Sequence, residues 1–159
     1  MAKPLTQGAL AGMAATLPMT LSMVTIRHFA PDGDEPMQME QVARGVAKKM
    51  RIYREMDRSE RDTFTWISHF GFGAAAGALF PLLAGKTENH AVIKGVAFGM
   101  GVWATSYLGV LPKMGIMRFP TREPTHTVVE EIVSHVVWGA ALGLVAKAIG
   151  SSLSKSTPS

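Results

Sequence analysis

The chain has 159 residues, of which 47% are hydrophobic, and its 16 Lys and Arg outnumber its 12 Asp and Glu. It has no cysteine, which excludes disulfides, thiolate metal sites and thiol nucleophiles. The charges are segregated, because residues 5–26, 63–85, 96–111 and 136–146 contain no Lys, Arg, Asp or Glu. Since about 20 mostly apolar residues cross a bilayer, we expect an all-α integral membrane four-helix bundle, formed by a single domain over residues 1–150.

The first span is expected over about residues 6–27, where the Gly- and Ala-rich run leaves no polar face. A loop follows, and then an amphipathic helix over about residues 35–55, with Asp34 as its N-cap. We expect this helix to lie in the headgroup plane on anionic lipid, and docking against a partner protein is the alternative. Its membrane-surface cations are Arg44, Lys48, Lys49, Arg51 and Arg54.

The other three spans follow a charged turn at residues 57–62. They are expected over about residues 63–85, 91–111 and 127–149, and the third span is expected to end before Pro112. A Ser-rich tail at 151–159 is expected to be disordered.

The distribution of basic residues predicts the topology. The connections between spans one and two and between spans three and four hold 11 of the 16 Lys and Arg. By the positive-inside rule these connections are cytoplasmic, so both termini are expected outside or in the periplasm. Topology accounts for the basic charge, and we therefore expect the lipid bilayer, and no nucleic acid, as a partner.

An internal repeat relates the two halves of the chain. Residues 68–77 match residues 134–143 at Ser, His, Gly, Ala, Ala and Gly, and residues 8–13 match 95–100 more weakly. We infer two tandem helical hairpins of equal orientation, related by an axis along the membrane normal. Each span also carries two glycines four residues apart, a spacing that lets helices pack closely in lipid. They are Gly8, Gly12, Gly73, Gly77, Gly95, Gly99, Gly139 and Gly143.

Ionisable side chains inside a membrane are costly and are therefore the first functional candidates. Here they are His69 and His135, which the repeat places at equal depth, and Glu131, one helical turn before His135. Ser68 and Ser134 precede the two histidines and are candidate hydrogen-bond partners. The histidines either join helices by hydrogen bonds or form, with Glu131, a site on the cytoplasmic side that binds protons, because imidazole changes charge near neutral pH.

Two further interpretations use the same residues. Two histidines at matching depth suit a bis-His haem b, whose propionates Arg58 and Arg61 could meet. The second interpretation is a metal ion held by His69, His135 and Glu131. The sequence contains no phosphate loop, Ser-His-Asp set or zinc-protease motif, so no enzymatic activity is predicted.

Several short motifs point to a family. They are Pro-Met-Thr at residues 18–20, His69 followed by Gly-Ala-Ala-Ala-Gly at 73–77, the segment 103–112 and His-Val-Val-Trp-Gly at 135–139. On these motifs the chain resembles the YagU-like group of small bacterial inner-membrane proteins of unknown function. The resemblance implies a multi-pass protein of the bacterial inner membrane, with an association of one member with acid resistance. It assigns no catalytic residue.

We therefore expect a small, non-enzymatic membrane protein of stress or proton homeostasis, in which His69, His135 and Glu131 change protonation. Two alternatives stay open. One is an accessory or structural subunit of a larger membrane complex or a homodimer, and the other is a protein that binds haem or a metal ion between its two histidines.

Overall fold

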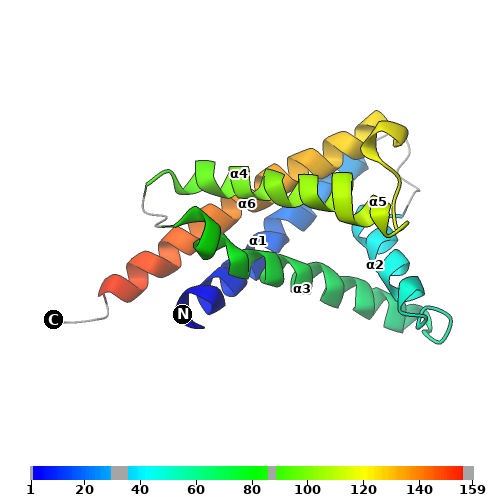
Figure 1. Cartoon of the computed structure of the whole chain (residues 1–159), viewed down its shortest axis with the longest axis horizontal. Coiled ribbons are helices and arrows are strands. Elements are labelled where there is room, and N and C mark those ends of the chain that lie inside the picture. Colours follow the sequence, from blue (N-terminus) through cyan, green and yellow to red (C-terminus); the bar gives the residue numbers. More distant parts are fainter. Residues whose placement is uncertain (1, 30–35, 86–88, 156–159) are drawn as a thin grey trace.

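The structure is a computed structural model that describes residues 2–29, 36–85 and 89–155 (Figure 1). Four of the described helical segments are long and apolar enough to cross a membrane. All four expose large apolar side chains, as Leu21, Ile67, Ile93 and Leu144 illustrate, and contact with lipid explains this exposure. The predicted all-α, four-span architecture is confirmed. The spans are Pro4–His28, Arg58–Ala84, Ala91–Lys113 and Thr125–Ser152.

The spans form two hairpins that follow one another in the chain. Helix α1 (Ala2–His28) packs along α3 (Arg58–Ala84), and α4 (Ala91–Thr105) packs along α6 (Thr125–Lys155). The hairpins meet mainly where α1 crosses α6, and α3 and α4 flank this central pair (Figure 1). The start of α1 and the end of α6 lie at one end of the bundle, whereas α2 (Gln38–Lys49) lies at the other (Figure 1).

The helix between the first two spans is shorter than the 35–55 that we expected. Helix α2 begins after Met37, which makes no side-chain cap, and Asp34 lies outside the described residues. The helix ends at Lys49 because Arg51 adopts a left-handed conformation with φ 63°. The amides of Arg51 and Ile52 then bond back to the carbonyls of Lys48 and Ala47, which satisfies the last turn of the helix. The expected membrane-surface cations are all exposed: Arg44, Lys48, Lys49, Arg51 and Arg54.

Helix α3 includes the charged segment that we expected to be a turn. Its start is fixed by a capping box, in which the Asp57 carboxylate accepts from the Glu60 amide at 2.9 Å and the Glu60 carboxylate accepts from the Asp57 amide at 2.8 Å. These two bonds satisfy amides that the first helical turn leaves without partners. The second span therefore begins at Arg58 rather than at residue 63.

Replacing Asp57 by alanine is expected to loosen the start of α3. The change removes the side-chain acceptor of the Glu60 amide and costs about 0.5–2 kcal/mol of helix stability. Amide hydrogen exchange over residues 58–61 should accelerate, while exchange in the centre of α3 should stay slow. Glu55→Ala, a change at an exposed neighbour outside the capping box, is the control. Equal acceleration in both variants would show that charge, not capping, is responsible.

The third span continues through Pro112, so the expected end before that residue is wrong. After α4 comes a π-helical turn, η1 (Ser106–Val110), and then α5 (Leu111–Lys113). The amide of Leu111 bonds to the carbonyl of Ser106, five residues back. Because proline has no N–H to donate, this wider turn lets the helix accommodate Pro112.

A short 3-10 helix, η2 (Pro120–Arg122), precedes α6 in the connection that returns the chain to the membrane. Helix α6 extends beyond the expected range of 127–149 at both ends, from Thr125 to Lys155. Residues 151–155 are therefore helical, and the expected disorder of the tail is wrong for them. Residues 156–159 lie outside the described part of the chain.

Glycine pairs bring the helices of each hairpin into backbone contact. A Cβ atom on Gly12 would meet the Gly73 carbonyl oxygen and the Gly77 Cα, and one on Gly95 would meet backbone atoms of Gly139 and Gly143. Gly12 and Gly95 therefore occupy equivalent places in the two hairpins. In the sequence match, Gly95 is aligned with Gly8. In the packing, Gly95 is instead equivalent to Gly12, which lies one helical turn further along α1.

Candidate functional site

The two repeated histidines line one cavity near the middle of the bundle. The cavity has a volume of about 30 Å³, enough for one or two water molecules. All four spans contribute to its wall. The lining residues are Thr16 and Met19 of α1, His69, Phe72 and Gly73 of α3, Val102 of α4, and His135 and Trp138 of α6.

The histidines lie at nearly equal depth in the bundle. His69 follows the first residue of α3 by 11 residues, and His135 follows the first residue of α6 by 10. At 1.5 Å per residue, these separations place them about 15–17 Å from the end where α2 lies. The first turns of both helices carry charged residues, among them Arg58, Asp62 and Glu131, so the histidines lie in the half of the membrane nearer to α2, about a quarter of the way into a hydrocarbon core about 30 Å thick.

The proton on His135 can be assigned from its surroundings. The side chain is 5% exposed, and its Nδ1 lies 2.8 Å from the backbone carbonyl oxygen of Glu131. A carbonyl oxygen only accepts, so Nδ1 carries a proton and donates it. In the neutral ring, Nε2 is then the atom that can accept a further proton. The ring also meets the edge of Tyr107, with 5.7 Å between centroids.

His69 is held by a threonine of α1. Its Nε2 lies 3.1 Å from the Thr20 hydroxyl oxygen, and that hydroxyl donates to the Thr16 carbonyl at 2.8 Å. A hydroxyl has one proton, so both contacts hold together only if His69 Nε2 donates to Thr20. The two histidines therefore present opposite ring nitrogens as acceptors when neutral, Nδ1 for His69 and Nε2 for His135.

The two serines that precede the histidines differ in their placement. Ser134 is buried at the contact between α1 and α6, with its hydroxyl oxygen 3.2 Å from that of Ser22. Ser68 is partly exposed and does not line the cavity. The repeated Ser-His pair thus contributes both histidines but only one serine to the buried polar region.

Glu131 lies one turn from His135, towards the end where α2 lies. It is 4% exposed, and its Oε2 accepts a long hydrogen bond of 3.4 Å from Trp103 Nε1. Trp103 precedes the π-helical turn, and Tyr107 lies within it. The turn therefore belongs to the segment of the third span that supplies aromatic partners to both Glu131 and His135.

A second buried carboxyl, Glu130, lies beside a cluster of incompletely bonded polar atoms. Glu130 is 4% exposed, and the charges of Arg27 and His126 act on it. Glu130 Oε1, Arg27 Nη2 and Gln38 Oε1 are buried and have no hydrogen-bond partner among the described residues. Buried polar atoms of this kind are normally paired with water or a ligand. Polar groups therefore extend from the α2 end of the bundle to the histidine cavity.

The other half of the bundle is apolar and tightly packed. On the side of the chain termini, the glycine pairs place backbone against backbone in both hairpins. Between the hairpins lies a core of small and aromatic side chains: Ala11, Ala15, Ala76, Phe80, Trp138 and Leu142. Trp138 forms the boundary, because it lines the cavity and donates from Nε1 to the Gly12 carbonyl at 3.2 Å. The buried polar region is thus closed on the side of the termini.

The cavity does not fit a haem. Pockets for organic ligands measure about 300–1,000 Å³, roughly ten times the space between His69 and His135. Among the residues that the structure describes, no group of three His, Cys, Asp or Glu side chains could hold a metal ion. His69, His135 and Glu131 do not converge on a common point, because Glu131 is directed to Trp103.

Sequence reasoning found the histidines and Glu131 but missed their partners. Thr20, Trp103 and Tyr107 lie in the motifs that carry the family resemblance, but nothing in the sequence indicates that they, or Ser22, contact the histidines, Glu131 or Ser134. The signal for Glu130 was available, because it is ionisable and adjacent to Glu131. Its burial could not be predicted, since carboxylates near the start of a span are ordinarily solvated and favour the helix N-terminus.

Comparison with known proteins identifies one family. Its model, described as a protein of unknown function (DUF1440), matches residues 22–144. No curated protein and no solved structure matches the chain. The matched region runs from the second half of α1 to the middle of α6 and so contains His69, Glu131 and His135.

Proposed function

We propose that this chain, which belongs to the DUF1440 family of proteins of unknown function, binds protons reversibly at a buried site in the half of the membrane nearer to α2. The groups that exchange the proton are His69, His135 and Glu131. The protein is non-enzymatic, and its role is in stress or proton homeostasis. The observation that carries the proposal is the shared cavity, where two histidines from equivalent helices line a space large enough for water.

Access to the site favours proton exchange with one side of the membrane. Among the residues that the structure describes, the buried polar groups reach the cavity from the α2 end, and glycine and apolar packing closes the opposite end. Water and carboxyl groups conduct protons, whereas tight apolar packing does not. A site open to one side binds and releases protons without carrying them across.

The proposed location is the bacterial inner membrane, with the α2 end in the cytoplasm. Basic residues concentrate at that end, in α2, in the connection that follows it, and between the third and fourth spans. Such segments are retained on the cytoplasmic side during insertion. The site then responds to cytoplasmic pH. Cysteine labelling from each side of intact cells, at residue 49 and separately at residue 152, tests this orientation.

Trp138 provides a probe of proton binding, because it lines the cavity beside both histidines. A protonated imidazole quenches the fluorescence of a neighbouring indole. We expect the tryptophan fluorescence of the detergent-purified protein to fall reversibly as the pH is lowered from about 8 to about 4, because the histidines gain charge when they bind protons. The double variant His69→Asn/His135→Asn should lose most of this change.

The control is His28→Asn, which removes an exposed histidine at the end of α1. It should leave the pH response intact. Glu131→Gln should keep the oxygen that accepts from Trp103 but remove the infrared band of a carboxylic acid that accompanies protonation. A fluorescence change that survives the double replacement would show that the histidines only join helices and would contradict the proposal.

A further inference from the structure

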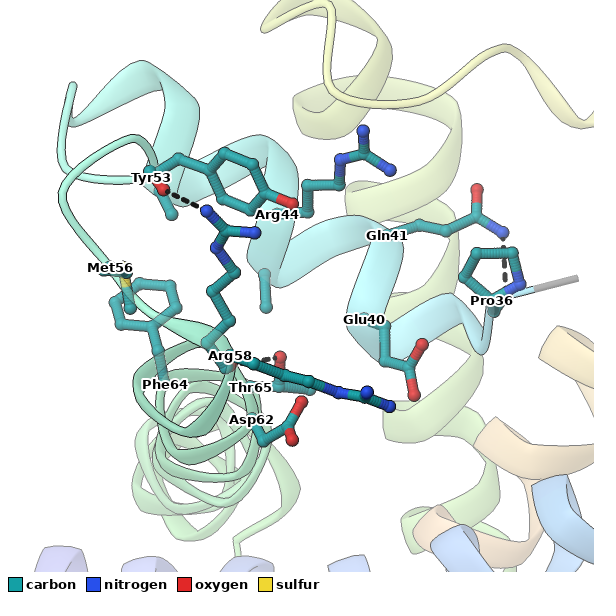
Figure 2. Close-up of a pocket in the computed structure, with 13 residues that line it drawn as sticks. Pro36, Glu40, Gln41, Arg44, Tyr53, Met56, Arg58, Asp62, Phe64 and Thr65 are labelled. Atoms are coloured by element: carbon teal, nitrogen blue, oxygen red, sulfur yellow. Dashed lines mark hydrogen bonds between the residues drawn. The ribbon is translucent and has the colours of Figure 1, made fainter.

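A second, larger cavity lies outside the histidine cavity, between α2 and the first turns of α3 (Figure 2). Its volume is about 190 Å³, several times that of the histidine cavity. Residues from α2, from the connection at 53–56 and from α3 form its wall. Its polar lining includes Arg44, Arg58 and Arg61, together with the carboxylates Glu40 and Asp62.

Three cations gather around one aromatic ring of this wall. The guanidinium carbon of Arg61 lies 4.2 Å from the centre of the Tyr53 ring. The guanidinium carbon of Arg44 and the ammonium nitrogen of Lys48 each lie 5.6 Å from it. Cation–π contact stabilises each charge. Three cations beside one ring make this part of the wall strongly positive, which attracts an anion.

The hydrogen bonding of Arg61 also favours a bound anion. Its Nη2 donates to the Tyr53 carbonyl at 3.2 Å, whereas its Nε is buried and has no hydrogen-bond partner among the described residues. The carboxylates of the cavity do not meet this need, because Figure 2 places Glu40 and Asp62 beside Arg58, on the side away from Tyr53. The Tyr53 side of the cavity therefore has excess positive charge and an unused donor.

We propose that this cavity binds the phosphate of a phospholipid headgroup, with Arg44 and Arg61 as its principal ligands and Lys48 in support. Guanidinium groups bind phosphate oxygens through charge-assisted hydrogen bonds. The cavity lies at the start of the α3 span, where a headgroup would be. Phe64 lines it, and Ile67, one turn further into the span, is 67% exposed, so the acyl chains have an apolar surface to follow.

The test uses the full chain in dodecyl maltoside micelles and native mass spectrometry with added palmitoyl-oleoyl phosphatidylglycerol. We expect one tightly bound lipid per chain. Arg44 and Lys48 are both exposed, so Arg44→Gln/Lys48→Gln should fold normally and weaken this binding at least about tenfold, since it removes two charge-assisted contacts. The single variant Arg61→Gln should weaken it similarly, with helicity followed by circular dichroism.

The matched control is Lys49→Gln/Arg54→Gln, which removes two exposed charges from the same segment but outside the cavity. It should change binding less than about twofold. An equal loss in both double variants would show diffuse attraction to a basic surface and would overturn the proposal. Displacement of the lipid by millimolar inorganic phosphate, with binding of phosphate alone, would assign the site to a soluble phosphate instead. None of these outcomes bears on the histidine cavity, whose fluorescence test stands separately.

Discussion

Replacing Gly95 by alanine is expected to destabilise the bundle by about 1–3 kcal/mol, the usual range for overpacking a close contact. The added methyl group would meet the carbonyl oxygen of Gly139 and the backbone of Gly143, neither of which can move aside without separating α4 from α6. Gly12→Ala, at the equivalent place in the first hairpin, should cost a similar amount. Unfolding by sodium dodecyl sulfate in mixed micelles, followed by circular dichroism, measures both.

Gly101→Ala is the control for this prediction, because Gly101 lies on the same helix with nothing within 4 Å of an added Cβ. Alanine is the better helix former by about 0.5–1 kcal/mol, so this variant should be unchanged or more stable. The two substitutions are chemically identical and should differ in sign. A loss of stability of similar size at Gly101 and Gly95 would mean that helix propensity, not contact between hairpin helices, sets the result.

The second large effect is expected at Trp138. The indole is 3% exposed, stacks on Phe98 with 6.1 Å between centroids, and donates to the Gly12 carbonyl. Phe98 in turn meets Phe80, so this aromatic series links α6 to α4 and α3. Trp138→Ala removes the last ring of this aromatic series and leaves a void. We expect the free energy of unfolding to fall by about 3–5 kcal/mol in the same assay.

Trp66→Ala is the matched control, because Trp66 is 45% exposed on α3. Its removal should cost less than about 1 kcal/mol. Trp138→Phe keeps most of the bulk and deletes the hydrogen bond, so it should cost about 0.5–1.5 kcal/mol. If Trp138→Ala were no more harmful than Trp66→Ala, the apolar boundary of the histidine cavity would not be a packed core.

The membrane architecture could be predicted because charge and apolar sequence are segregated along the chain. Four uncharged stretches marked the spans, and the Ser-His repeat indicated two histidines at equal depth. These features depend on composition and on local spacing. The ends of the helices were less predictable, since they depend on single conformations such as the left-handed Arg51, a residue type that rarely adopts it.

The contacts that define the site could not be predicted from spacing. The Thr20–His69 pair is separated by 49 residues and the Trp103–Glu131 pair by 28, and their meeting depends on how the helices are rotated and staggered. The glycine repeat illustrates the difficulty, because two pairings one turn apart fit its spacing equally well. Only the packing showed that Gly12, and not Gly8, is equivalent to Gly95.

The depth of the histidines has a consequence for the membrane potential. A proton that reaches them from the α2 end crosses about a quarter of the hydrocarbon core, and a full crossing is worth about 2.3 kcal/mol per 100 mV. A potential of 100 mV, negative on the α2 side, would therefore oppose occupancy by roughly 0.6 kcal/mol, or about threefold. Collapse of the potential would load the site at constant pH. Such a protein would register the electrical as well as the chemical part of the proton gradient.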